Sequence, residues 1–167
     1  MQIPSALRPS GTYPLRTSVH IPKATPTFRR WHGPSSGDAY GGKPIVDFRG
    51  HPAFAELAIL WALRDAGWDG VWVDSFRRRY RRTYWEPEAP ITLPKHAERL
   101  FQKIQRRAAP DGRCWDVFCW RRERVLFAEA KRASRDHMRR SQLKWLRAAL
   151  DLRLPVSAFL IVEWRLD

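Results

Sequence analysis

The chain has 167 residues, which suits one domain with a sizeable hydrophobic core. Its 31 Lys and Arg residues against 17 Asp and Glu give a formal net charge of +14 at pH 7. That excess indicates a polyanionic partner, nucleic acid before an anionic membrane, because no apolar run is long enough to span a bilayer. Two cysteines, Cys114 and Cys119, are too few for a zinc site, so we expect free thiols in a reducing, cytoplasmic compartment.

Residues 1–50 differ in composition from the remainder of the chain. They hold seven of the thirteen prolines and no acidic residue before Asp38. Proline at this density favours extended or irregular backbone. Two interpretations stay open: a basic arm that lies along nucleic acid, and a poorly ordered tail. The sequence therefore predicts an N-terminal arm over residues 1–50 and an α/β domain over residues 51–167.

The first half of the predicted domain consists of two helices and a strand. Ala53–Asp65 is predicted to be a helix, with Pro52 at its first position and Gly67 at its end. It is apolar nearly all round, which indicates a helix packed inside the fold against a sheet. A strand over Gly70–Phe76 and an amphipathic helix over Lys95–Arg107 follow.

The second half is predicted to contain a β-hairpin, a helix and a last strand. The hairpin strands are Cys114–Trp120 and Val125–Arg132, the helix is Asp136–Leu150, and the strand is Val156–Trp164. The order helix, strand, helix, strand, strand, helix, strand predicts a mixed sheet with helices on its faces.

The hairpin carries three charged residues in one place. A symmetric loop of two or four residues sets Asp116 opposite Glu129, with their Cβ atoms about 5 Å apart. The period of two puts Lys131 on the same face. The apolar run Val125–Ala128 indicates a strand that is covered on both sides, where acids need compensation from a divalent cation and Lys131. The alternative is that all three are tolerated charges on a solvated face.

Two further polar residues lie on apolar faces. Gln142 shares the inward stripe of the helix after the hairpin, where an unpaired amide would cost about 1–3 kcal/mol. It is either a partner of the hairpin acids or a capping group, and the sequence favours neither. Glu56 is the one acid in the body of the first helix, and it either joins the same site or pairs with an arginine at the surface.

Two basic blocks supply candidate phosphate contacts. The candidates are Arg77, Arg78, Arg79, Arg81, Arg82, Arg132, Arg135, Arg139 and Arg140. Tyr80, Tyr84 and Trp85 are candidates for stacking on bases. Solvated surface charge remains the alternative for any single arginine.

With these residues identified, roughly residues 52–164 resemble the PD-(D/E)XK nuclease superfamily, and most closely its VRR-NUC branch. The matching segments are Phe54–Leu57, Trp115–Phe118, Leu126–Lys131, Ser141–Leu146 and Pro155–Val156. Trp115 stands where the family usually has proline, which removes a turn preference but no metal ligand. The resemblance implies a restriction-endonuclease-like fold, a mixed β-sheet flanked by helices in the order predicted above.

The resemblance also implies a function, a Mg²⁺- or Mn²⁺-dependent endonuclease that hydrolyses phosphodiester bonds in DNA. Asp116, Glu129 and the Ala130 carbonyl would hold the metal, with Glu56 contributing directly or through water. Lys131 would orient the attacking water, and Gln142 would support the site. Family members include enzymes for branched or flapped DNA, and small ones tend to form homodimers. Two alternatives stay open: a non-catalytic basic nucleic-acid-binding module, and the same chemistry acting on RNA.

Overall fold

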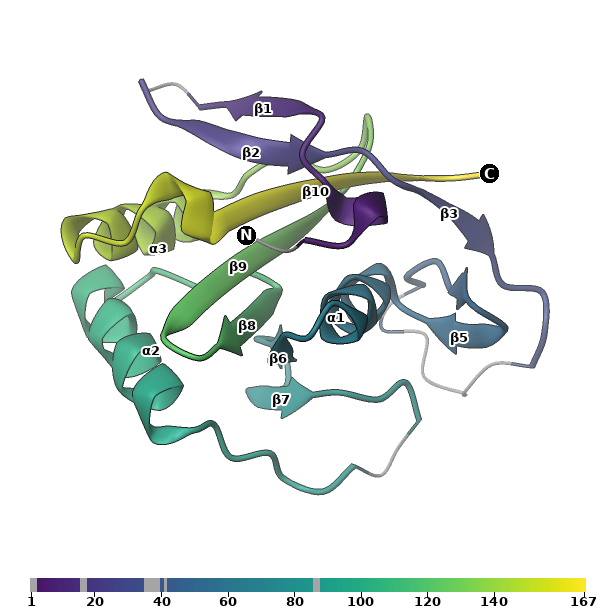
Figure 1. The fold of residues 1–167 in the computed structure, drawn as a ribbon, viewed down its shortest axis with the longest axis horizontal. Helices are drawn as coiled ribbons and strands as arrows, with labels where there is room; N and C mark the ends of the chain where they lie inside the picture. The colour runs from purple at the N-terminus through teal and green to yellow at the C-terminus, as the bar shows by residue number, and fades with distance from the viewer. Residues whose placement is uncertain (1–2, 16–17, 35–39, 41, 86–87) are drawn as a thin grey trace.

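The computed structural model describes residues 3–15, 18–34, 40, 42–85 and 88–167. Within them the chain forms ten strands and three α-helices, shown in Figure 1. The strands are β1 (Gly11–Pro14), β2 (His20–Ala24), β3 (Thr27–Arg30), β4 (Val46–Phe48), β5 (His51–Ala53), β6 (Asp69–Asp74), β7 (Arg79–Arg81), β8 (Val117–Arg121), β9 (Arg124–Arg132) and β10 (Phe159–Leu166). The helices are α1 (Ala55–Asp65), α2 (Lys95–Ala108) and α3 (Arg140–Asp151), with 3₁₀ turns at Ser5–Leu7 and Val156–Ala158.

The strands form one mixed, mostly antiparallel sheet. Its order is β5-β4-β3-β10-β9-β8-β6-β7, and β2 also pairs with β10 and with β1. The pairs that β10 makes with β9, β2 and β3 are parallel. The predicted mixed α/β architecture is therefore confirmed, and each helix and strand predicted after residue 52 has a counterpart at nearly the same residues.

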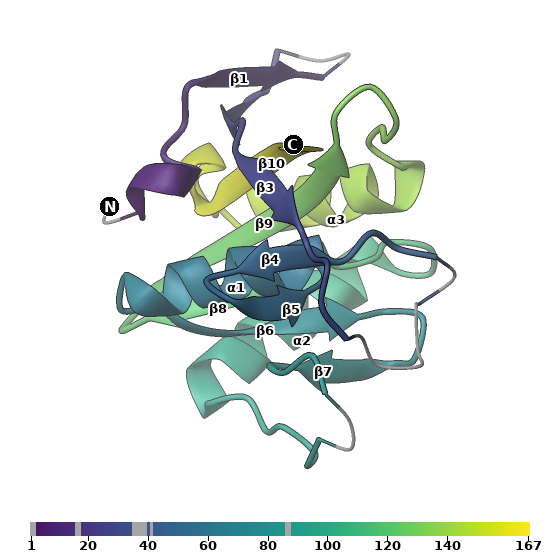
Figure 2. The same cartoon turned by 90° about the vertical axis from the view of Figure 1, so that its right-hand side faces the viewer.

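Helices cover both faces of the central strands. In Figure 1, α1 lies on one side of β8 and β9, and α2 and α3 lie on the other. Figure 2 shows β4 and β5 lying over α1. Alternate residues of β9 follow this division: Leu126 and Ala128 belong to the core beside α1, and Phe127 belongs to the core beside α2 and α3. Burial on both faces explains why this strand is a continuous apolar run.

The described residues of the N-terminal segment extend this sheet. Lys23 of β2 pairs with Ile161 of β10, and Thr27 of β3 pairs with Arg165. The prolines are compatible with strands here: Pro14 lies in β1, which pairs with β2 alone among the described strands, and Pro22 precedes the two residues of β2 that pair with β10. The segment that the sequence left open between an arm and a tail thus contributes strands beside β10.

Two helix starts and one strand differ from the prediction. Pro52 lies in β5, so α1 begins at Ala55. The helix predicted from Asp136 begins at Arg140, because Asp136 accepts the Arg132 N–H at 2.8 Å and closes a turn instead. The short strand β7 pairs with β6 and was not predicted. Within the described ranges, no helix is long and apolar enough to cross a membrane.

Candidate active site

The β8–β9 hairpin has the predicted register. Val117 pairs with Ala128 and Phe118 with Phe127, which leaves the two-residue loop Arg122-Glu123. Asp116 directly precedes β8 and lies level with Glu129. The Asp116 N–H donates to the Glu129 carboxylate (3.2 Å), and the Ala130 N–H donates to Asp116 Oδ2 (3.0 Å). The two acids thus meet at one end of the hairpin, each bonded to the other strand.

Lys131 and Gln142 complete a buried polar cluster with Glu129. Lys131 Nζ donates to Glu129 Oε1 (2.8 Å) and to Gln142 Oε1 (3.1 Å), and Gln142 Nε2 donates to the same Glu129 oxygen. Glu129 is 1% exposed and Lys131 is 4% exposed. Period-two alternation places both on the sheet face that α3 covers, and the inward stripe of α3 brings Gln142 to them.

Gln142 also caps α3. Its side-chain oxygen accepts the Arg139 N–H at 2.9 Å, a bond that satisfies one of the unpaired donors at the start of the helix. The sequence left open whether Gln142 is a site partner or a capping group, and its side chain serves as both. The cap fixes where α3 begins and thereby holds the amide against Glu129 and Lys131.

The electrostatics of the cluster disfavour the charged form of its acids. Burial raises the pKa of Asp116 well above its ordinary value, and the nearby Glu129 and Glu56 carboxylates raise it further, against the opposing effect of Lys43 and Lys131. Burial also raises the pKa of Glu129, although Lys131 opposes the shift. Because burial disfavours the charged form of these acids, a cation that approaches them would stabilise that charged form strongly.

Glu56 enters the same charged region from α1. It lies in the first turn of the helix, is 7% exposed, and forms an ion pair with Lys43. Burial lowers the pKa of Lys43, but Glu56 first, and then Asp116 and Asp74, raise it above its ordinary value. Lys43 was not predicted as part of the site, because a single lysine in a segment rich in glycine and proline carries no pattern. The ion pair answers the question left open for Glu56: its partner is a lysine within the region of Asp116.

The donors predicted to bind a metal fit a hard cation in type, since all are oxygen atoms. Among the described residues, no three His, Cys, Asp or Glu side chains lie together as a metal-binding group. The nearest set is therefore two carboxylates, Asp116 and Glu129, with the Ala130 backbone between them. The N–H and C=O of a strand residue face the same neighbouring strand, so the Ala130 carbonyl lies at the edge where its N–H meets Asp116.

The first basic block divides into buried and exposed residues. Arg81, predicted to contact nucleic acid, is instead 1% exposed, and its guanidinium donates to the Tyr84 carbonyl (2.9 Å) and the Tyr40 hydroxyl (2.7 Å). It stabilises the protein interior, because β7 directs it inward. Arg79 donates to the same hydroxyl (2.7 Å), and Arg82 pairs with Asp69 (3.1 Å).

The remaining predicted phosphate contacts lie closer to solvent. Arg77 and Arg78 are exposed in the turn between β6 and β7, with Arg77 over the Tyr40 ring at 4.2 Å. Arg135, Arg139 and Arg140 are exposed in the connection from β9 into α3. Arg132 is half-buried and lies over the Trp164 ring at 5.8 Å. This second block follows Lys131 directly along the chain.

Both cysteines are free and buried, as predicted. They belong to different cores, Cys119 to the one beside α1 and Cys114 to the one beside α2 and α3. Burial raises the pKa of both thiols, so neither is a reactive thiolate.

Comparison with protein-family models, with curated proteins and with solved structures found no match for this chain. The chemistry of the cluster itself is therefore the basis for a function.

Proposed function

We propose that the chain is a metal-dependent nuclease with a restriction-endonuclease-like core, which hydrolyses phosphodiester bonds in DNA, including branched or structured DNA. One observation carries the proposal. Asp116 and Glu129 meet at the end of the hairpin, with Lys131 and Gln142 bonded to Glu129, while burial and the neighbouring carboxylates raise the pKa of Asp116.

In this proposal Asp116, Glu129 and the Ala130 carbonyl would hold Mg²⁺ or Mn²⁺, and Glu56 would contribute directly or through water. The bound cation would polarise the scissile phosphate and offset the negative charge that grows in the transition state. Lys131 orients the attacking water and adds its own positive charge. Gln142 keeps Lys131 and Glu129 in position through the bonds it makes to both.

The second candidate is a basic nucleic-acid-binding domain without catalysis. The Glu129–Lys131 ion pair favours it, since the pair neutralises one of the two acids without a metal. The charge of +14 also explains affinity for nucleic acid on its own. The nuclease stays the stronger proposal, because a binding surface has no need of buried acids behind it. RNA as the substrate is a variant of the same chemistry, and parallel rates on DNA and RNA of one sequence separate the two.

The test is cleavage of supercoiled plasmid and of branched DNA with Mg²⁺ or Mn²⁺, using wild type and Asp116→Asn. The matched control is Asp151→Asn, which removes an exposed carboxylate paired with Arg107 at 3.2 Å. We expect Asp116→Asn to lower the rate about 100-fold or more and Asp151→Asn to leave it unchanged.

Asparagine keeps the oxygen that accepts the Ala130 N–H, so the variant is expected to fold. Equal cleavage by wild type and Asp116→Asn would remove the hairpin from the mechanism. Salt-sensitive binding with no cleavage by any preparation in either metal would instead support the non-catalytic domain.

A further inference from the structure

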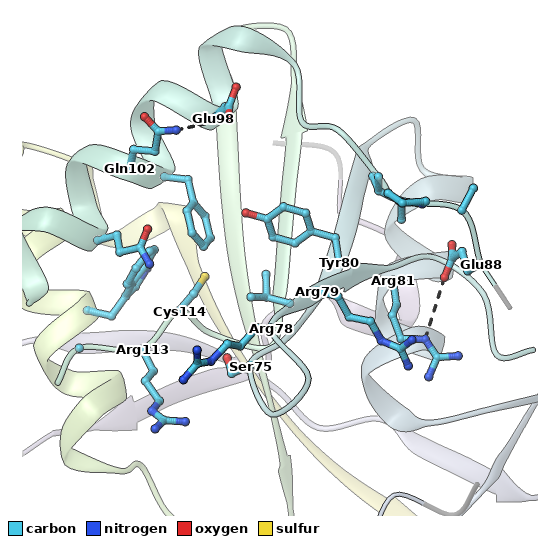
Figure 3. A pocket seen from close by; sticks show the side chains of 18 residues that line it. Ser75, Arg78, Arg79, Tyr80, Arg81, Glu88, Glu98, Gln102, Arg113 and Cys114 are labelled. Atoms are coloured by element: carbon cyan, nitrogen blue, oxygen red, sulfur yellow. Dashed lines mark hydrogen bonds and ion pairs between the residues drawn. The ribbon is translucent and has the colours of Figure 1, made fainter. Parts of the chain in front are cut away.

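A cavity of about 830 Å³ opens beside the candidate site, between the β6–β7 hairpin, residues 88–91 and α2 (Figure 3). Its volume is in the range of pockets that hold small organic groups. Tyr80, Phe101 and Trp145 are part of its lining, and we call it the Tyr80 cavity.

The aromatic wall of the Tyr80 cavity offers a flat surface and a phenol donor. The Tyr80 and Phe101 rings meet edge to face with centroids 5.9 Å apart, and Phe101 lies 5.0 Å from Trp145. Burial raises the pKa of Tyr80 to about 12, so the ring stays a neutral phenol. Such a wall suits a planar group that carries its own acceptors.

Polar and cationic groups complete the lining. Glu98 and Gln102 of α2 bond to each other (3.3 Å) and line one side, where they offer an acceptor and a donor. Figure 3 shows Arg78 and Arg113 near each other on another side, next to Ser75 and Cys114. An aromatic wall, amide and carboxylate groups, and two guanidinium groups together match the base and the phosphate of one nucleotide.

The Tyr80 cavity adjoins the candidate active site. Cys114, in its wall, lies two residues before Asp116. Val73 also lines it, and the Val73 N–H donates to the Asp116 carbonyl at 2.7 Å. Trp145 lies one helical turn after Gln142 in α3. The Tyr80 cavity therefore lies beside the backbone of Asp116, where the proposed function places the scissile phosphate.

We propose that the Tyr80 cavity holds one unpaired base of a DNA strand, with Arg78 and Arg113 on the adjoining phosphate. The inference rests on the proposed function, because it assigns the substrate class of that same site. A base inside a duplex must leave its stack to enter such a cavity, which costs a few kcal/mol, and an unpaired base avoids most of that cost. The preferred substrate is thus DNA with an unpaired nucleotide beside the cleaved bond.

The turn at the rim of the cavity supports this choice. Ser75 and Arg78 line the cavity, and Phe76 between them is 87% exposed. An exposed aromatic ring that is followed directly by arginines suits stacking on the end of a duplex where a strand becomes unpaired.

The experiment measures binding in EDTA, so that no cleavage is needed. Two duplexes of equal length and charge carry 2-aminopurine opposite thymine or opposite an abasic site. We expect wild type to bind the duplex with 2-aminopurine opposite the abasic site about tenfold tighter. This is the gain in affinity that stacking of one base on aromatic side chains provides. Tyr80→Leu should abolish this preference and Tyr80→Phe should keep it. Tyr13→Leu, a tyrosine of β1 outside the cavity lining, should also keep it.

A second variant fills the cavity without removing a core side chain. Ala89 lines the cavity and is exposed, so Ala89→Trp should fold and abolish the preference. Equal affinity of wild type for the two duplexes, or a preference that survives in folded Ala89→Trp, overturns the inference. Asp116→Asn separates the two proposals, because it should keep the base preference while it loses cleavage. A preference without cleavage in wild type supports the cavity and refutes the nuclease.

Discussion

Two Glu–Lys pairs lie on neighbouring strands and differ mainly in burial. In β9, Glu129 and Lys131 are 2.8 Å apart, and their side chains are 2% and 5% exposed. Glu163 of β10, which pairs with Lys131 in the β9–β10 ladder, bonds Lys23 of β2 at 3.1 Å, and those side chains are 26% and 25% exposed. The same two residue types thus occur side by side, one pair inside the protein and one at its margin.

The difference in burial between the two pairs indicates which of them belongs to a functional site. A solvent-exposed ion pair typically contributes about 0–1 kcal/mol. A buried pair must recover the cost of removing two charges from water, and it is often less stabilising than apolar side chains of the same volume. Glu129 and Lys131 recover part of that cost through Gln142, whereas the pKa of Asp116 beside them stays well above its ordinary value although the carboxylate accepts the Ala130 N–H. Places where local rules of stability are broken are the expected functional sites.

The largest contrast is expected from removing the lysine of each pair. Lys131→Met leaves the buried Glu129 without its cation, which should lower the free energy of unfolding by about 3–5 kcal/mol and the cleavage rate by about 100-fold or more. Lys23→Met should lower the free energy of unfolding by about 1 kcal/mol or less. Urea denaturation of both variants measures the contrast. Equal losses would mean that burial does not distinguish the pairs.

Gln142→Leu tests the support of the buried pair. The substitution removes the donor to Glu129, the acceptor for Lys131 and the cap of α3, so a loss of about 1–3 kcal/mol of stability is expected. Gln105→Leu, at an exposed position of α2, should change stability by less than about 0.5 kcal/mol. Thermal denaturation of the two variants is the measurement. A neutral Gln142→Leu would show that the amide bonds contribute nothing to the cluster.

The pH dependence of stability tests the raised pKa of Asp116. A carboxyl whose pKa is raised on folding holds its proton more tightly in the folded state, so its ionisation opposes folding. That opposition is absent below the unfolded pKa of about 3.9 and grows as the pH rises toward the raised value. In EDTA, the melting temperature of Asp116→Asn should therefore be higher than that of wild type at pH 7. Near pH 3 the two melting temperatures should be equal.

Metal should reverse that difference, because the ionised carboxylate is the form that binds a cation. Mg²⁺ is expected to raise the melting temperature of wild type more at pH 8 than at pH 5, and to leave Asp116→Asn unchanged. A metal effect of the same size in both proteins would locate the binding elsewhere.

The smallest effect is expected at an ion pair on the surface. Asp111 accepts a hydrogen bond from Lys144 at 2.6 Å, and that bond, with the lysine charge, lowers the pKa of Asp111. A lowered pKa contributes stability above the unfolded value of about 3.9, and the contribution is lost as the pH falls through the folded value. Lys144→Met should thus cost a little stability at pH 7 and none at pH 2. A loss comparable to that of Lys131→Met would contradict the role given to burial.

The sequence by itself determined the hairpin register and the meeting of its charged residues. A two-residue loop and a period of two suffice to set Asp116 opposite Glu129 and to place Lys131 on the same face. The helical period of α3 likewise directed Gln142 inward. These relations are local, because they depend on residues that are close along the chain and on fixed backbone geometry.

Only the tertiary structure decided which other groups surround that cluster. It brought Lys43 to Glu56, buried Arg81 instead of exposing it, paired β2 and β3 with β10, and enclosed the Tyr80 cavity between elements that the sequence showed as separate. Each of these contacts joins residues without a shared period or turn, so packing of the whole chain, and not a local pattern, selects them.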